Sequence, residues 1–196
     1  MRETNNFFKI VFYFFFIFTV HVDSKEISMG NTDASVTVKV FSSLTCPHCA
    51  SFHNKIFNNL KTDFIDKGLV RFEHYAFPLD LAALNAELVV RCQTNNDKRF
   101  KLLEEIYSKQ KFWAVGSDIN KINDLIKDIG LGFGLTKDKM NSCLKNSKVQ
   151  DEILNERIKA QKKYKINSTP TIIVNERKYE GKIDYKTFKK IIDKNL

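Results

Sequence analysis

The sequence predicts an α/β fold in which a four-stranded sheet of mixed direction has helices on both faces and carries an all-helical insertion. Three observations support this fold class. Two strand-like runs flank an amphipathic helical pattern near the beginning of the chain. Helical patterns then fill the middle of the chain, and the last part contains a helix, two strands and a helix. Sheet elements that surround a purely helical block predict one layered domain with an insertion.

The first sheet unit is predicted at 36–77. Residues 36–41 alternate and are rich in valine, which is typical of a strand. Residues 47–66 place apolar side chains at steps of three and four, and Gly68 ends this helix. A second strand follows at 69–77. Because a helix connects the two strands, they are expected to be parallel.

The insertion is predicted at 78–146. Asp118 and Thr136 are typical helix N-caps, and the glycine-rich stretch 130–134 is expected to be a connector. This stretch lacks the strand-then-helix context of a phosphate-binding loop, so the sequence gives no support for a nucleotide site. The helical patterns of the insertion cover approximately 81–92, 98–110, 119–129 and 137–145.

The sheet is completed by the end of the chain. Ser147 is expected to begin a helix that runs to about Tyr164, with Gln150 at the capping-box position. Strands are expected at 171–174 and 177–180, before a last helix capped by Asp184. The sheet domain would therefore consist of residues 34–77 and 147–196.

Residues 1–24 are predicted to be a signal peptide. Arg2 and Lys9 precede an apolar run at 10–20, which is short for a membrane span. An uncleaved N-terminal anchor is the alternative. Either case places the folded part outside the cytoplasm, and we expect the periplasm. The composition, 43% hydrophobic and 28% charged over 196 residues, is that of an ordinary globular domain.

The stretch Cys46-Pro47-His48-Cys49 carries the chemistry. Residues at i and i+3 share one helix face, so the two sulfurs can bond to each other. Pro47 suits the first helical position, which leaves Cys46 at the N-cap. Free backbone N–H groups and the helix dipole favour a thiolate there. The sequence therefore predicts a thiol–disulfide exchange site with Cys46, Pro47, His48 and Cys49 as its catalytic residues.

The remaining cysteines argue against a metal site. Cys92 and Cys143 lack the close pairing that a second half of a zinc site requires, and we expect neither a metal nor a cofactor. Because an exported chain with an even number of cysteines tends to form disulfides, a structural disulfide between these two is favoured. Free buried thiols and a second redox pair remain as alternatives. An inert structural disulfide at Cys46 and Cys49 would not need Pro-His between the thiols.

The other polar residues of note have simpler interpretations. His53 and His74 are expected to be ordinary helix and strand residues. The net charge is +9, and the basic run 159–165 is expected to be a solvated helix face rather than a nucleic-acid site.

The quartet at 46–49, the Thr169-Pro170 pair before a strand and the helical block between them resemble thioredoxin-fold thiol oxidoreductases. The chain is most similar to the DsbA-like branch, the bacterial periplasmic disulfide oxidases, and to its alphaproteobacterial-type members. The resemblance covers 34–196 and implies a thioredoxin fold. It implies that Cys46 is the nucleophile, Cys49 the buried resolving thiol, and His48 a group that stabilises the Cys46 thiolate.

The resemblance also assigns a role to the Thr169-Pro170 pair. Pro170 would be the family's cis-proline, with Thr169 facing the active-site sulfurs. The Thr169 backbone could then pair with an extended substrate segment.

Two positions depart from the family pattern. Relatives often carry a buried acidic residue where this chain has Val40. A valine commonly precedes the cis-proline in the oxidases, whereas isomerase-type relatives often have threonine, as Thr169 is here.

These features predict an exported thiol:disulfide oxidoreductase that introduces disulfide bonds into secreted or periplasmic proteins through Cys46 and Cys49. Its expected partners are unfolded or newly exported polypeptides and a membrane quinone-linked reoxidase of the DsbB kind, with no nucleic acid, and the protein is expected to be a monomer. One alternative is a disulfide isomerase or reductase kept reduced by a membrane electron donor. Another is a membrane-tethered binding or chaperone protein whose cysteines do not turn over.

Overall fold

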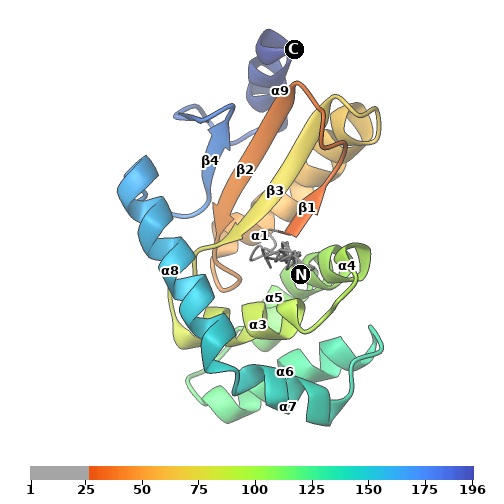
Figure 1. The fold of residues 1–196 in the computed structure, drawn as a ribbon, viewed down its shortest axis with the longest axis vertical. Coiled ribbons are helices and arrows are strands. Elements are labelled where there is room, and N and C mark those ends of the chain that lie inside the picture. Colours follow the sequence, from red (N-terminus) through yellow and green to blue (C-terminus); the bar gives the residue numbers. More distant parts are fainter. Residues whose placement is uncertain (1–26) are drawn as a thin grey trace, which may run out of the picture.

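The computed structural model describes residues 27–196, so the predicted signal peptide lies outside the described residues. A five-stranded mixed sheet has the order β1-β3-β2-β4-β5 (Figure 1). At its centre, β2 (Val36–Ser42) runs parallel to β3 (Val70–Ala76) and antiparallel to β4 (Thr171–Val174). The edge strands β1 (Ile27–Met29) and β5 (Arg177–Lys178) pair antiparallel to β3 and β4.

The α/β architecture agrees with the prediction, but the expected count of four strands was wrong. The additional strand, β1, is only three residues long, which is too short to show an alternating pattern in the sequence. It is held by the burial of Ile27, which is 0% exposed. Gly30 then turns the chain towards β2 with a φ of +100°, and a Cβ there would lie 2.4 Å from the Val70 carbonyl oxygen.

Helices cover both faces of the sheet. A continuous helical run contains α1 (Pro47–Phe52), α2 (Asn58–Leu60) and π-helical turns at His53–Phe57 and Lys61–Ile65. This run and α9 (Tyr185–Asn195) share one apolar core with Val36, Val38 and Val40 of β2. On the other face, α8 (Ser147–Tyr164) packs against Phe41 and Ile173. Strand β2 therefore contributes to two cores, with Val36, Val38 and Val40 in one and Phe41 in the other.

The inserted helices lie at one end of the sheet, between β3 and β4 in the chain (Figure 1). Asp118 and Thr136 are N-caps, as predicted, and their side chains accept hydrogen bonds from the backbone N–H groups of Lys121 and Lys139. Among residues 27–196, none of the helices combines the length and apolarity that crossing a bilayer requires. The inserted helices are α3 (Leu81–Arg91), α4 (Asn96–Ser108), α5 (Gln110–Trp113), α6 (Ile119–Leu131) and α7 (Lys137–Leu144).

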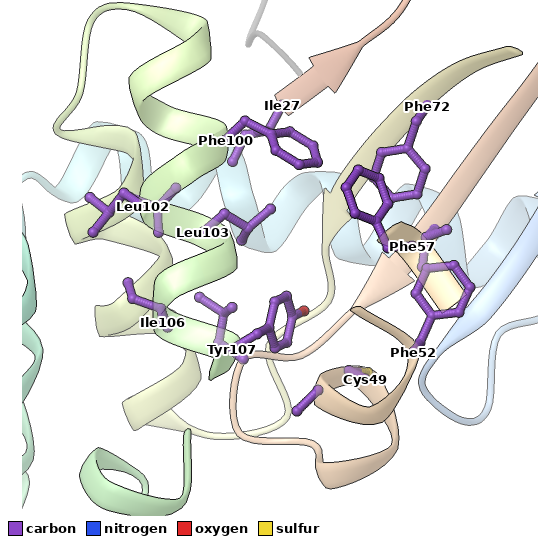
Figure 2. Close-up of a cluster of buried hydrophobic side chains, with 14 of the residues drawn as sticks. Ile27, Cys49, Phe52, Phe57, Phe72, Phe100, Leu102, Leu103, Ile106 and Tyr107 are labelled. Carbon is purple, nitrogen blue, oxygen red and sulfur yellow. The ribbon is translucent and has the colours of Figure 1, made fainter. Parts of the chain in front are cut away.

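An aromatic layer fixes α4 against the first helix and the sheet, as Figure 2 shows. The ring of Phe57 lies 4.8 Å from that of Phe72 on β3 and 5.1 Å from that of Phe100 on α4, between ring centroids. All three side chains are completely buried. This layer places α4 behind the amino-terminal end of α1, where the cysteine pair lies.

Two local predictions are corrected. The N-cap of α8 is Asn146, whose side chain accepts a hydrogen bond from Val149 N–H at 3.2 Å, rather than Ser147. Gln150 instead donates to the Leu144 carbonyl. The predicted connector at 130–134 begins later, because α6 continues through Gly130. Met140 packs there so closely that a Cβ would lie 2.4 Å from its sulfur.

Candidate active site

Cys46 lies at the N-cap of α1, and Pro47 occupies the first turn of that helix. The backbone of Cys46 is extended (φ −77°, ψ 119°). The Cys46 carbonyl accepts hydrogen bonds from Cys49 N–H at 3.0 Å and from Ala50 N–H at 3.1 Å. Cys49 follows one turn later and is 0% exposed, whereas Cys46 is 8% exposed. Both cysteines are free thiols. The fold therefore leaves Cys46 slightly exposed and buries Cys49 completely.

The two thiols have opposite acidities. The pKa of Cys46 is lowered to about 5, chiefly because the Cys49 thiol donates a hydrogen bond to its sulfur, with further help from the backbone N–H groups of Cys49 and His48. Burial raises the pKa of Cys49 well above its ordinary value, and the hydrogen bond to Cys46 raises it further. At neutral pH the reduced pair is therefore a Cys46 thiolate beside a Cys49 thiol.

The loop before β4 meets this pair. The Thr169–Pro170 peptide is cis. The Thr169 carbonyl lies 3.4 Å from Cys46 Sγ and accepts a hydrogen bond from it when Cys46 is protonated. Next to this contact is a groove of about 510 Å³, whose lining includes His48, Phe52, Thr169, Pro170 and Tyr185. The side chains of Pro47 and His48 are exposed at the same surface.

Two contacts hold the loop that carries Cys46, and the sequence pattern did not reveal either. The buried Gln110 amide donates hydrogen bonds to the carbonyls of Leu44 (2.7 Å) and Cys46 (3.0 Å). Thr45 donates from its hydroxyl to the carboxylate of Asp80, the N-cap of α3, at 2.7 Å. In the sequence Gln110 is only the last residue of a helical pattern, and nothing local connects it to Cys46.

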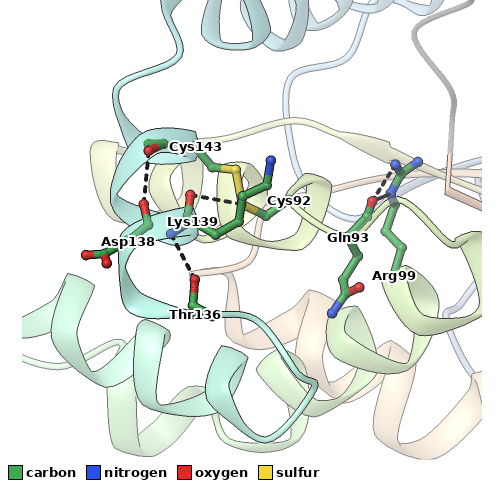
Figure 3. Close-up of a disulfide and its surroundings, with 8 residues drawn as sticks. Cys92, Gln93, Arg99, Thr136, Asp138, Lys139 and Cys143 are labelled. Atoms are coloured by element: carbon green, nitrogen blue, oxygen red, sulfur yellow. Dashed lines mark hydrogen bonds between the residues drawn. A yellow bond between two sulfur atoms is a disulfide. The ribbon is translucent and has the colours of Figure 1, made fainter.

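Cys92 and Cys143 are placed apart from the exchange pair, in the helical insertion. They form a disulfide across 51 positions of the sequence, joining the end of α3 to α7 (Figure 3). Across residues 27–196, the structure contains no group of three or more His, Cys, Asp or Glu side chains that could hold a metal ion.

Comparisons with known proteins agree with this geometry. A family model described as Thioredoxin matches residues 23–194. The crystal structure of alpha-DsbA1 from Wolbachia pipientis superposes with a TM-score of 0.80 at 26% identity, covering 87% of this chain and 90% of that chain. The chain belongs to the DsbA-like thioredoxin family. The predictions of this family and of the thioredoxin fold are therefore confirmed.

Two relatives show how far the likeness extends. Disulfide bond formation protein D of Bacillus subtilis is 32% identical over 178 residues, which cover 86% of this chain and 76% of that protein. A Rickettsia bellii protein that bears the name protein-disulfide oxidoreductase is 31% identical over 158 residues. That match covers 80% of this chain but 60% of the relative, so the DsbA-like chain spans only part of the rickettsial protein's length.

The acidity of Cys46 yields a direct prediction. In the reduced protein, alkylation of Cys46 by iodoacetamide should titrate with a midpoint near pH 5, because the thiolate is the reactive form. Cys49→Ala should shift this midpoint upward, since it removes the hydrogen bond that is the largest cause of the lowered pKa. The midpoints of the wild type and of Cys49→Ala can be measured from alkylation rates by mass spectrometry and from the ultraviolet absorbance of the thiolate. A wild-type midpoint near 9 would contradict the prediction.

Proposed function

We propose that this protein is an exported thiol:disulfide oxidase that donates a Cys46–Cys49 disulfide to the thiols of newly exported polypeptides. The lowered pKa of Cys46 at the beginning of α1 carries this proposal. A group that stabilises the Cys46 thiolate stabilises the reduced protein, so the disulfide form is easily reduced and is a strong oxidant of other thiols.

The proposed exchange takes two steps. A substrate thiolate attacks Cys46 Sγ; the Cys46–Cys49 bond breaks, its electron pair remains on Cys49, and Cys49 takes up a proton. A second substrate thiolate then attacks the substrate sulfur of the mixed disulfide. This forms the substrate disulfide and releases Cys46 as a thiolate. The low pKa of Cys46 favours its departure in the second step.

Substrate binding is proposed at Thr169 and Pro170. The Thr169 backbone lies beside Cys46 Sγ, and the groove of about 510 Å³ opens next to it. An extended chain that pairs with backbone groups there would be held largely independently of its sequence, which suits a protein with many unfolded substrates.

Compartment and partners are part of the same proposal. The apolar run at 10–20 supports export to the periplasm, and the Cys92–Cys143 disulfide is of a kind that persists in oxidising compartments. A membrane quinone-linked reoxidase of the DsbB kind would restore the Cys46–Cys49 disulfide. We propose a monomer with residues 34–77 and 147–196 as the thioredoxin-like part and 78–146 as the insertion. Nucleic acid has no part in the proposed reaction.

A disulfide isomerase or reductase is the second candidate function. Thr169 favours it, because threonine before the cis-proline is the feature that the sequence shares with isomerase-type relatives. Such a protein would be kept reduced by a membrane electron donor and would rearrange or open existing disulfides.

A glutathione equilibrium titration tests the direction of transfer. We expect the Cys46–Cys49 couple to have a reduction potential well above about −230 mV, and therefore above that of the cytosolic glutathione pool. A potential near that of thioredoxin, about −270 mV, would contradict the oxidase and favour a reductase. The Cys92–Cys143 disulfide should stay oxidised throughout, which mass spectrometry of the alkylated protein would verify.

A further inference from the structure

A second groove opens beside the cysteine pair, along a different face of α1 from the groove that contains Thr169 and Pro170. Its volume is about 660 Å³, compared with about 510 Å³ for the first groove. One wall comes from the first helical run, and the other comes from the end of α4, from α5 and from the residues after α5. We call it the α1–α5 groove. Its lining includes Pro47, Ala50, Lys55, Gln110, Lys111 and Val115.

The two grooves lie on either side of Cys46. Thr45 and Pro47, the sequence neighbours of Cys46, line the α1–α5 groove. Thr169, whose carbonyl lies 3.4 Å from Cys46 Sγ, lines the first groove. Lys55 lines both grooves. A substrate chain whose sulfur reaches Cys46 can therefore extend from the cis-proline into the α1–α5 groove.

The α1–α5 groove is basic. Lys55 and Lys111 are exposed in its walls, and none of its lining side chains carries a carboxylate. Neither lysine forms an ion pair with any residue that the structure describes. The first groove differs, because Asp184 lines it, with a carboxylate that accepts hydrogen bonds from Thr187. Two positive charges without a partner in the protein are thus presented only on the α1–α5 side of Cys46, within the described residues.

Apolar side chains lie next to these charges. Val115 is 52% exposed in the wall of the groove, and Phe112, the residue after Lys111, is 75% exposed. Pro47 and Ala50 contribute apolar surface from the opposite wall. Large apolar side chains that gather at one exposed place mark interaction surfaces. The groove therefore suits a segment that combines apolar residues with a negative charge.

Hydrogen bonds hold the groove in a fixed position relative to the reactive sulfur. Gln110, in the wall formed by the insertion, donates from its buried amide to the Leu44 carbonyl at 2.7 Å and to the Cys46 carbonyl at 3.0 Å. Lys111 follows Gln110 directly in the chain. A segment bound in the groove is therefore held at a defined distance from Cys46.

We propose that the α1–α5 groove binds the substrate chain beside its reactive cysteine and selects segments that carry an acidic side chain there. This inference rests on the proposed exchange function and deepens it by naming a substrate class, unfolded polypeptides with Asp or Glu and apolar residues near the cysteine. Lys55 and Lys111 are its specificity-determining residues, since each can pair with a substrate carboxylate.

The geometry of an extended chain gives the expected position of the acid. Side chains two and four positions from the substrate cysteine point to the same face of the chain as the cysteine. They lie about 7 and 13 Å from it along the chain, at about 3.3 Å per residue. Lys55 lies nine positions after Cys46, which is also about 13 Å along a helix. Acids at these two positions are therefore the ones that reach the lysines.

Reduction of the oxidised full chain by short cysteine peptides tests this proposal. The peptides have one central cysteine among apolar residues and carry either glutamate or glutamine two and four positions away on both sides. The peptide thiolate attacks Cys46 Sγ, and Cys49 leaves with the electron pair of the broken disulfide. Acid quenching and mass spectrometry follow the loss of the protein disulfide. The rate with the glutamate peptide divided by the rate with the glutamine peptide measures the preference for acid.

This preference is compared between the wild type and a variant with both Lys55→Gln and Lys111→Gln. Glutamate also changes the pKa of the peptide thiol itself, but that effect is the same for both proteins and cancels in the comparison. We expect the preference at low ionic strength to be about fivefold, and at least twofold, higher in the wild type than in the variant. In the wild type it should fall at high salt, because exposed charges are screened. Lys148→Gln combined with Lys162→Gln is the matched control, since it removes the same charge from exposed side chains of α8 that line neither groove, and it should keep the wild-type preference.

The other outcomes each overturn a defined statement. A difference below twofold between the wild type and the groove variant overturns the selection of acidic segments. An equal loss of preference in the α8 control also overturns it, because the effect would then belong to the net charge of +9 rather than to the groove. A preference that is insensitive to salt overturns the pairing of charges. If circular dichroism shows that the double variant is unfolded, Lys111→Gln alone takes its place with the same twofold threshold. Failure of both peptides to reduce the wild type would instead overturn the proposed function itself.

Discussion

Cys46→Ser should reduce thiol–disulfide exchange to the uncatalysed rate. A serine hydroxyl cannot form a disulfide, and its ionisation lies far above neutral pH, whereas the pKa of Cys46 is about 5. Cys49→Ser should act differently, because the nucleophile is intact and only the buried resolving thiol is lost. We expect this variant to accumulate a mixed disulfide between Cys46 and its substrate. Oxidation of a reduced dithiol peptide, followed by chromatography, measures the first effect, and non-reducing mass spectrometry measures the second.

Both variants replace one sulfur by one oxygen at the beginning of α1. Because Cys49→Ser buries its hydroxyl in the core, circular dichroism of both variants is the control for folding. Full dithiol oxidation by Cys46→Ser would contradict the mechanism. Failure of Cys49→Ser to trap any substrate would show that Cys46 does not begin the exchange.

The sequence predicted the local part of this site correctly, because the relevant signals are local. A proline at the first turn, an N-cap position and a helical period are properties of a few consecutive residues. The same holds for the caps at Asp118 and Thr136. The short edge strand β1 was missed, since three residues carry no period and its pairing with β3 is decided by tertiary contact.

The parts of the site that depend on distant contacts could not be predicted. Gln110 lies 64 positions from Cys46, yet its amide fixes the Cys46 carbonyl. His53 and His74 were expected to be ordinary helix and strand residues, which is what each one's local pattern indicates. Only the packing of the first helical run against β3 and α4 brings their rings together with Tyr107.

Replacing both Cys92 and Cys143 with alanine should lower the free energy of unfolding by about 4 kcal/mol. The disulfide spans 51 positions, and opening a loop of that length returns this much chain entropy to the unfolded state in the loop-closure description. For a domain of this size, the midpoint of thermal unfolding should fall by about 10 °C. Urea unfolding followed by circular dichroism measures the difference. The protein with the Cys92–Cys143 disulfide and the alanine variant should both also carry Cys46→Ala and Cys49→Ala. The exchange pair then does not contribute to the measured difference in stability.

Loss of the Cys92–Cys143 disulfide should lower the stability of the protein without a comparable loss of thiol–disulfide exchange. Cys92 is the C-cap of α3, whereas Asp80, which accepts the hydrogen bond from the Cys46 loop, is the N-cap at the opposite end of the same helix. Glu87 is held independently by Arg91, which is itself paired with Glu156 of α8. With Cys46 and Cys49 present, the alanine pair should therefore keep an exchange rate within a few-fold of wild type at temperatures well below its unfolding midpoint. If the folded alanine variant instead lost exchange as completely as Cys46→Ser, Cys92 and Cys143 would be a second redox pair. If the free energy of unfolding changed by less than about 1 kcal/mol, the loop would already be constrained in the unfolded chain.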